Sequence, residues 1–566
     1  MENKKYNNKK IIAVSIIIIF SILMILPFLL VGQIGVDSDW SFHAARVQQI
    51  YLNLKKGEFF TYLATDTFSK VGNANFLFYP NFILYPWAFL KFIFAPVTAY
   101  LIYIWLIFLA TGLIAFFSMI SFTRGKIRQS LFFALIYLIA PYHLYLTLTN
   151  YVLGEAQAYT FLPLILLGMW NILYRNKWVT LAVGMTLIAY SHYVSVFISA
   201  EVCVMILACY LIQNRKIEFS KLVSLLKSVC LFVLLSAWQF VPLFTDYLGK
   251  DLSRPLSGFF LVQSAGDFFT TAISNEAVNQ GGIGLLLIAT LAFGWKLVEK
   301  NSKYMWTYIL GIIITWMITA AFPWKYFTNT PLSIIQFPYR YTSYAIAFLA
   351  VILSKILIDL EFSNVNNRLI TSIIVLLFLT LYAGSIYSDL SRNKNSINKN
   401  PILTSTRRGQ YRTLTSASDL PVIVTNNFYN KQFSYGALYG ETDYMPEKAT
   451  KEWESVLNRI TIINGKRVAV YQESQPNKLI YKVKLPQNSI INFPALAYTH
   501  TVVTVNGDRT KFDISNRGTV QLKLNSGNYK IEVAYVPTKL LMVLRIVALI
   551  GWIFLILRTL FSLKHS

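Results

Sequence analysis

The fold of this chain is decided first by residues 11–31, which read IIAVSIIIIFSILMILPFLLV. A run of about 20 apolar residues is long enough to cross a bilayer as one helix. It follows the lysine-containing segment 1–10, and no small-residue cleavage site comes after it. We therefore expect a retained anchor rather than a cleaved signal peptide. Similar apolar runs recur along the chain and predict a membrane protein with many spans.

The composition supports this class of protein. Of the 566 residues, 55% are hydrophobic and 14% are charged, whereas an average globular protein carries about 25% charged residues. Cys203, Cys209 and Cys230 all lie within apolar runs. They provide neither a disulfide framework nor a cysteine-rich zinc module. The composition therefore excludes the soluble, collagenous and disordered classes.

The net charge of +25 is explained by membrane topology and not by nucleic acid. Lys and Arg collect in short loops between the apolar runs, and such loops face the cytoplasm. This rule predicts about twelve spans, with both termini in the cytoplasm. Residues 76–95 are apolar but contain Pro80 and Pro86, so we expect an interfacial helix there. The predicted spans are 11–31, 97–121, 130–150, 157–173, 178–191, 194–213, 228–246, 282–298, 304–321, 341–357, 369–387 and 540–562.

The stretch 388–537 has a different character from the rest of the chain. It is polar, and from about residue 459 apolar and polar side chains alternate with a period of two. Asn464-Gly465 and Asn506-Gly507 lie between alternating runs, which is a strong signal for hairpins. We expect a transmembrane domain at 1–387, a small extracellular β-sandwich at 388–537 and a membrane anchor at 538–566. The clearest strands are predicted at 478–485, 501–505, 518–524 and 529–536.

Polar groups at membrane depth are costly and usually functional, and here they are predicted to gather at the outer face. Residues 36–46 read VDSDWSFHAAR. A helix in this segment would place Asp39, His43 and Arg46 on one side. A carboxylate there can accept a proton from an attacking hydroxyl, or bind a divalent metal together with His43. The alternative is that a side chain such as Asp37 only caps a surface helix.

Two further outer loops supply polar residues on the same side. Glu155 lies between the third and fourth predicted spans. Together with Asp39 it would provide two carboxylates for a metal site or an acid–base pair. Alternatively, Glu155 only complements the dipole of the helix that follows it. His192 is either a polar residue of the outer cleft or a hydrogen-bonded packing residue.

The start of a later inward span carries Gln336 and Arg340. An arginine at the outer interface with a glutamine nearby can bind a phosphate in a bidentate manner. Alternatively, Arg340 snorkels to lipid headgroups, as we expect of Arg545 in the last span. Aromatic residues are dense in 76–95 and 323–341, either as an interfacial belt or as platforms for sugar rings.

The order and spacing of these motifs resemble a known family. The resemblance points to the GT-C glycosyltransferases, polytopic enzymes that use polyprenyl-phosphate-linked sugars. It points more narrowly to the YfhO-like bacterial membrane proteins, including those labelled "6-pyruvoyl-tetrahydropterin synthase related", and it covers nearly the whole chain. The motifs that carry it are Asp39-Trp40-Ser41-Phe42-His43-Ala44-Ala45-Arg46, Phe78-Tyr79-Pro80, Gly154-Glu155, Ser191-His192 and Gln336-Phe337-Pro338-Tyr339-Arg340.

The resemblance implies a role for individual residues. Asp39 would be the general base on the acceptor hydroxyl, and Glu155 would help to hold the acceptor or a divalent cation. That cation would be Mg or Mn, bound by Asp39 and Glu155. Arg340 would hold the donor phosphate. The full set of substrate-binding residues is expected to be Asp37, His43, Arg46, His192, Gln336 and Arg340.

Together these points predict an inverting glycosyltransferase in a bacterial plasma membrane. It would transfer a sugar from a polyprenyl-phosphate donor to a cell-envelope glycan or glycolipid, such as a teichoic acid, at the outer face. One alternative is a flippase or transporter of a lipid-linked glycan, which would place its polar residues near the membrane midplane. The other is a non-catalytic envelope assembly scaffold, which would tolerate Asp39→Asn. No nucleic-acid-binding module is present in the sequence.

Overall fold

The computed structural model describes residues 2–36, 38–254, 257–278, 280, 282–300, 302–359, 367–395, 423–434 and 440–564. These residues form two compact units. The first unit comprises 1–35, 97–232 and 256–398, and the second comprises 36–96, 233–255 and 399–566. Each unit is therefore built from segments that are far apart in the sequence. The three-part division expected from the sequence stays a prediction.

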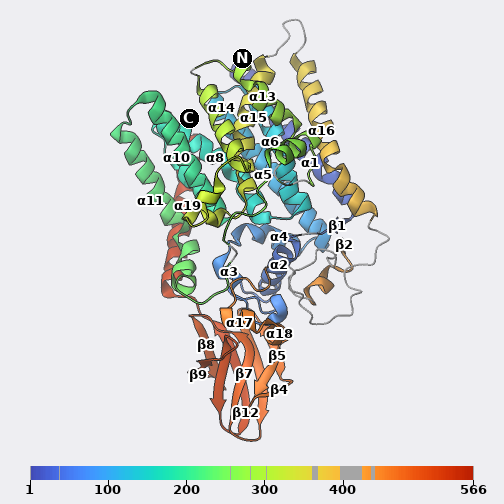
Figure 1. Ribbon diagram of the computed structural model, residues 1–566, viewed down its shortest axis with the longest axis vertical. Helices are drawn as coiled ribbons and strands as arrows, with labels where there is room; N and C mark the ends of the chain where they lie inside the picture. Colours follow the sequence, from blue (N-terminus) through green and yellow to red (C-terminus); the bar gives the residue numbers. More distant parts are fainter. Residues whose placement is uncertain are drawn as a thin grey trace. The chain divides into compact units, whose positions relative to one another are not determined.

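The first unit is a bundle of apolar helices (Figure 1). Short 3-10 turns in 324–341 lead into one of its most buried helices, α15. Its helices are α1 (Glu2–Val31), α5 (Pro96–Thr123), α6 (Ile127–Ile139), α7 (Pro141–Leu144), α8 (Leu153–Arg175), α9 (Val179–Ala189), α10 (Tyr193–Asn214), α12 (Ala265–Ser274), α13 (Leu285–Leu297), α14 (Lys303–Ile318), α15 (Thr342–Asp359) and α16 (Asn367–Asn395), while α11 (Phe219–Pro242) belongs partly to each unit.

The helices confirm a polytopic membrane protein but correct the number of full-length spans. Each of the predicted spans coincides with a helix. Among the described residues, however, only eight helices are long and apolar enough to cross a membrane, or nine if α6 and the bent segment Pro141–Thr149 form one span. The helices α9, α13 and α14 have 11, 13 and 16 residues. At 1.5 Å per residue an 11-residue helix covers about 17 Å, well short of a bilayer core of about 30 Å.

Close contacts fix α8, the helix that carries Glu155. A side chain at Gly168 would meet the Leu181 Cα at 2.6 Å, so only glycine lets α8 and α9 approach this closely. On another side of α8, the rings of Tyr137 and Tyr159 stack with centroids 4.1 Å apart. Each of these hydroxyls donates to the other residue's carbonyl oxygen at 2.7 Å. The start of α8 is therefore rigidly placed within the bundle.

The second unit contains the short helices of segment 36–96 and the last apolar helix. The segment expected to be interfacial forms only short helices, because Pro80 and Pro86 interrupt it. Arg545 Nη1 donates to the Tyr62 hydroxyl at 2.6 Å, and the guanidinium packs 4.1 Å over Phe60. The expected snorkelling of Arg545 stays a prediction. The helices of this unit are α2 (Trp40–Lys55), α3 (Asn75–Phe78), α4 (Tyr85–Leu90), α17 (Glu447–Lys451), α18 (Trp453–Leu457) and α19 (Lys539–Lys564).

The same unit contains the predicted β-sandwich. Two five-stranded antiparallel sheets have the orders β10-β11-β7-β3-β4 and β5-β6-β12-β8-β9, and both contribute side chains to one apolar core. Both predicted hairpins are confirmed, with positive φ at Asn464-Gly465 and Asn506-Gly507. The strands are β3 (Thr461–Ile463), β4 (Lys466–Val468), β5 (Tyr471–Gln475), β6 (Lys478–Leu485), β7 (Ser489–Leu496), β8 (Thr501–Val505), β9 (Asp508–Thr510), β10 (Asp513–Ile514), β11 (Thr519–Leu524) and β12 (Gly527–Tyr535).

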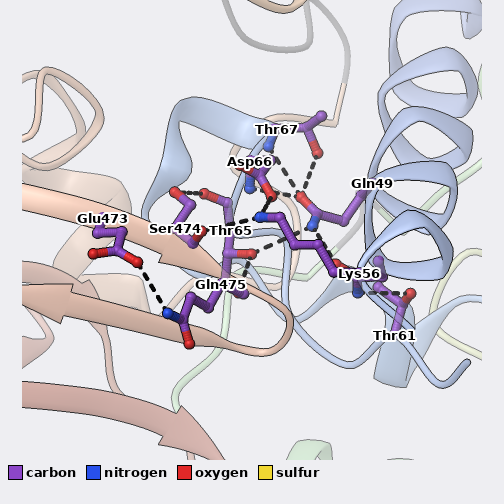
Figure 2. A network of polar contacts seen from close by, with 10 residues as sticks. Gln49, Lys56, Thr61, Thr65, Asp66, Thr67, Glu473, Ser474 and Gln475 are labelled. Carbon is purple, nitrogen blue, oxygen red and sulfur yellow. Dashed lines mark hydrogen bonds and ion pairs between the residues drawn. The ribbon is translucent and has the colours of Figure 1, made fainter. Parts of the chain in front are cut away.

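A polar network joins this sandwich to the loop after α2 (Figure 2). The Gln49 side-chain oxygen accepts from the Asp66 amide at 2.7 Å, and the Thr65 hydroxyl donates to the Gln475 carbonyl at 2.8 Å. Lys56 bonds to both Asp66 and the Ser474 carbonyl, at 3.3 and 3.1 Å. The sandwich is therefore fastened to the loop that follows α2.

Candidate active site

The centre of the candidate site in the first unit is the buried carboxylate of Glu155. It lies in the first turn of α8, where the helix dipole favours a negative charge. The Tyr142 hydroxyl donates to Glu155 Oε1 at 2.6 Å, and Arg340 Nε lies 3.5 Å from Oε2. Both oxygens therefore have a partner, as buried polar groups require.

Arg340 lies on the turn η7 (Pro338–Tyr341), directly before α15. Its Nη1 donates to the Ile335 carbonyl at 2.7 Å and to Gln336 Oε1 at 3.2 Å. The guanidinium lies 5.0 Å from the Phe337 ring centroid. Nη2 makes no hydrogen bond to any residue that the structure describes. The guanidinium is thus held on one side and retains a donor for an anion on the other.

An unusual backbone turn places Arg340. Gln336 has φ 62° and ψ −52°, and the Phe337 amide donates to the Ile335 carbonyl at 2.6 Å. This is the rare form of the γ-turn, which is strained for a residue other than glycine. The Phe260 amide holds the turn from outside by donating to the Gln336 carbonyl at 2.6 Å. Strain retained next to a buried ion pair supports a functional role for this turn.

His192 forms part of the same electrostatic environment. It is the N-cap residue of α10 and is 4% exposed, and its Nδ1 is hydrogen-bonded to Ser195 Oγ at 2.9 Å. Burial lowers the pKa of His192 well below its usual range, and the charge of Arg340 lowers it further. A neutral imidazole is therefore favoured near Arg340. Gln336 and Glu155 thus both contact Arg340, and His192 lies within reach of its charge, while the role of these residues in binding stays a prediction.

The second unit holds Asp39 at the N-cap position of α2, and its side chain is half-buried. It makes no capping hydrogen bond to the helix, so the described contacts of Asp39 do not support a capping role. Ser38, with φ 44°, donates its hydroxyl to Asp39 Oδ1 at 3.4 Å. Asp37 lies outside the described residues.

His43 and Arg46 face the protein interior and are 1% and 0% exposed. Arg46 Nη2 donates to the carbonyls of Tyr79 and Pro80, both at 2.8 Å. Its guanidinium also lies 4.8 Å from the Tyr79 ring centroid, and the His43 ring packs against the same tyrosine at 5.9 Å. These are the contacts of residues that position the Tyr79-Pro80 segment.

Sequence reasoning missed several polar residues. Tyr142 donates a hydrogen bond to Glu155, but it lies before the loop between the third and fourth predicted spans. Only its spacing from Glu155 in the sequence could have indicated it. Asp443 was missed because the polar stretch around it shows no recognisable pattern. Burial raises the pKa of Asp443 above its usual range. Glu441, 5% exposed, accepts from the Ser69 hydroxyl at 2.6 Å. These carboxyls lie in the same unit as Asp39.

The residues around Glu155 do not fit a divalent cation. A hard cation needs several oxygen ligands, but Glu155 is flanked by a hydroxyl donor, Tyr142, and a guanidinium, Arg340. Across the part of the chain that the structure describes, no group of three or more His, Cys, Asp or Glu side chains could hold a metal ion. We derive no step through a metal.

No protein-family model matches the chain. No curated protein matches it either. Among solved structures, the fold is similar to "Crystal Structure of ArnT from Cupriavidus metallidurans bound to Undecaprenyl phosphate", at 13% identity and a TM-score of 0.43 over 68% of this chain and 77% of that chain. It is also similar to the apo state of that protein, at 12% identity and a TM-score of 0.39 over 76% and 78% of the two chains. This similarity is too low to carry an argument about function.

Proposed function

We propose that this chain is a membrane glycosyltransferase that transfers a sugar from a polyprenyl-phosphate donor to a cell-envelope glycan or glycolipid. The observation that carries the proposal is the buried Glu155–Arg340 ion pair, which sits on a strained turn where membrane helices begin. A pre-oriented arginine at such a position suits a substrate whose leaving group is a lipid phosphate.

Arg340 would bind the donor phosphate through Nη2. Negative charge develops on the phosphate oxygen as its bond to the anomeric carbon breaks, and a fixed guanidinium stabilises that charge without reorganising. Glu155, Tyr142 and Gln336 would keep the guanidinium in place. His192, being neutral, would contribute a hydrogen bond to substrate without adding a second positive charge.

Asp39 would act as the general base. It would accept the proton of the acceptor hydroxyl while the acceptor oxygen forms its bond to the anomeric carbon. The bond from that carbon to the phosphate oxygen breaks in the same step, and polyprenyl phosphate leaves with the electron pair. A single displacement inverts the anomeric configuration. His43 and Arg46 would support this step by positioning the segment at Tyr79.

The setting of the reaction is part of the proposal. Positive loops favour cytoplasmic termini and an outer-face reaction in a bacterial plasma membrane. The acceptor would be a teichoic acid, another wall polysaccharide or a glycolipid. The chain would also be related to the YfhO-like proteins, which it resembles in short motifs such as the one at 39–46.

The decisive experiment measures sugar transfer in membranes that carry the native chain or a variant. Polyprenyl-phosphate sugars are supplied, and transfer to envelope glycans is followed at matched protein level. We expect Asp39→Asn to abolish transfer, because the amide cannot accept the proton. Asp508→Asn, at the exposed start of strand β9 in the β-sandwich, is the matched control and should transfer normally.

Glu155→Gln and Arg340→Ala complete the series and should also abolish transfer. The exposed Glu218→Gln serves as their control. Full transfer by Asp39→Asn would remove the assignment of the base. Absence of transfer by the native chain across a broad panel of donors would favour a transporter or a scaffold instead.

A further inference from the structure

An apolar hollow opens within the first unit, far along α8 from Glu155. Its volume, including its open mouth, is about 840 Å³. Side chains from α5, α6, α8, α10, α14 and α15 line it, among them Phe122, Trp170 and Leu310. Trp170 follows Glu155 by fifteen residues on the same helix, which corresponds to about 22 Å along the axis. The hollow is therefore separate from the candidate active site.

Lys303 lies at this hollow and is the one charged side chain among its described lining residues. Its Nζ lies 4.1 Å from the Phe122 ring centroid and 5.3 Å from that of Trp170, and it donates to the Phe122 carbonyl at 3.1 Å. The ammonium group is thus held at the boundary between an apolar wall and the loops.

Three further cations act on Lys303 electrostatically, and one of them, Arg175, bonds to Ser121, next to the Phe122 carbonyl that Lys303 bonds. Burial, followed by the charges of Arg124, Lys126 and Arg175, lowers the pKa of Lys303 to about 8. Arg175 is anchored by hydrogen bonds to the Ser121 hydroxyl and carbonyl, at 3.0 and 2.6 Å. These positive charges repel one another, so an anion at this position would stabilise all of them.

Two acidic side chains are found near the hollow among the described residues, and one of them, Glu218, is paired with Lys221, which bonds to the hydroxyl of the lining residue Tyr210. Asp359 acts electrostatically on Tyr304, which lies beside Lys303, but Asp359 is paired with Lys355 on the same helix. Its charge is therefore already neutralised, and the balance at the hollow remains positive.

We propose that this hollow binds an anionic glycerophospholipid, with one acyl chain against the apolar wall and the headgroup phosphate beside Lys303 and Arg175. A soluble anion would leave the apolar wall uncovered, and a zwitterionic lipid would not neutralise the cluster. Basic pockets between membrane helices on the cytoplasmic side attract such headgroups. The loops at this end, with Arg124 and Arg175, are those that charge distribution assigns to the cytoplasm.

The test uses Trp170 and Trp306, which both line the hollow. The full-length chain is placed in phosphatidylcholine vesicles that contain increasing phosphatidylglycerol, with bromine on the acyl chains of one lipid at a time. We expect brominated phosphatidylglycerol to quench tryptophan fluorescence saturably at low mole fraction, and brominated phosphatidylcholine to quench weakly there. The difference should disappear when both tryptophans are replaced by Phe.

Variants separate this site from general lipid contact. Lys303→Gln should raise the phosphatidylglycerol fraction for half-maximal quenching about five-fold, as expected for loss of one headgroup cation. Thr307→Phe should block the acyl chain without changing charge. Lys511→Gln, exposed in the β-sandwich, should change nothing. Equal quenching by both lipids, quenching selective for a polyprenyl phosphate, or an unchanged midpoint in folded Lys303→Gln would overturn the proposal. The experiment measures lipid binding and not sugar transfer, so the lipid site and the proposed function can each be overturned without the other.

Discussion

Glu155 and Arg340 are almost excluded from solvent, with side-chain exposures of 4% and 11%. Breaking a buried ion pair by removing one partner commonly costs about 3–5 kcal/mol, whereas replacing both by apolar side chains is often neutral. The ion pair therefore adds little to the net stability of the folded protein. A part in the proposed reaction explains better why this ion pair lies beside a strained turn. Single-residue variants can separate that role from a role in stability.

Arg340→Lys keeps a positive charge but loses the planar guanidinium, which faces Glu155 and would also face the donor phosphate. We expect the protein to accumulate in membranes at near-native level while transfer falls by about 100-fold, the scale of losing one oxyanion donor. A double variant, Glu155→Met with Arg340→Met, should also accumulate but transfer nothing. Transfer at the native rate by Arg340→Lys would show that the fork is not used.

Gln336 offers a test of backbone strain. Gln336→Gly and Gln336→Ala both remove the side-chain bond to Arg340, but only glycine relaxes at φ 62° and ψ −52°. We expect the glycine variant to be more stable than the alanine variant by about 1 kcal/mol, and both to lose transfer activity. Thermal unfolding in detergent measures the difference. Equal midpoints would mean that the turn is not strained.

Asp443 gives a pH-dependent expectation. Burial raises its pKa in the folded state, so the carboxyl favours folding while protonated, and this contribution is lost as pH rises through that pKa. Asp443→Asn should therefore unfold at a higher temperature than the native chain at pH 7, and the difference should shrink toward pH 4. A variant that is less stable than native at pH 7 would contradict this sign.

At the scale of elements, the sequence was enough to predict a structure wherever neighbouring residues determine its conformation. The Asn-Gly pairs predicted both hairpins because the turn demands positive φ at two successive residues. Apolar runs predicted every membrane helix of the bundle. Helix length was not predictable in the same way, because α9, α13 and α14 end where turns and tertiary contacts stop them. The bend of 49° before Pro141 follows from the missing amide of proline.

The hairpin between β8 and β9 allows an element-level prediction. Gly507 has φ 101°, and no atom lies within 4 Å of the place that a Cβ would take, so Gly507→Val meets backbone strain but no clash at that carbon. We expect a loss of about 1–2 kcal/mol in the stability of the β-sandwich. Thr510→Val on the same hairpin is the control, with calorimetry of the full chain as the measurement. An unchanged transition would show that the turn adapts.

At the scale of the whole molecule, sequence reasoning did not reveal how the segments group into two units. The loop after α2 joins the β-sandwich through contacts such as Thr65 with Gln475, and no local pattern signals pairs so distant in sequence. The same limitation hid Tyr142 and Asp443. The divalent cation, by contrast, was suggested by residue type and by the family resemblance; it stays a prediction, and the guanidinium beside Glu155 argues against it.

Metal removal tests that conclusion for the full-length chain. Treatment of membranes with EDTA should leave sugar transfer within about twofold of the untreated rate, because no step requires a Lewis acid. Added Mg or Mn should not increase the rate. A loss of transfer that either ion restores would require a metal ligand set other than Glu155 and its described neighbours.

The bond from Arg46 to the carbonyls of Tyr79 and Pro80 has an evolutionary consequence. A chain that loses the guanidinium leaves the Tyr79 and Pro80 carbonyls without this donor, whereas any residue at these two positions would still offer a backbone carbonyl. Selection on Arg46 should therefore act through the course of the 79–80 backbone and not through the side chains there. Descendants of a common ancestor are expected to keep Arg46 wherever they keep this backbone course, even where residues 79 and 80 have changed.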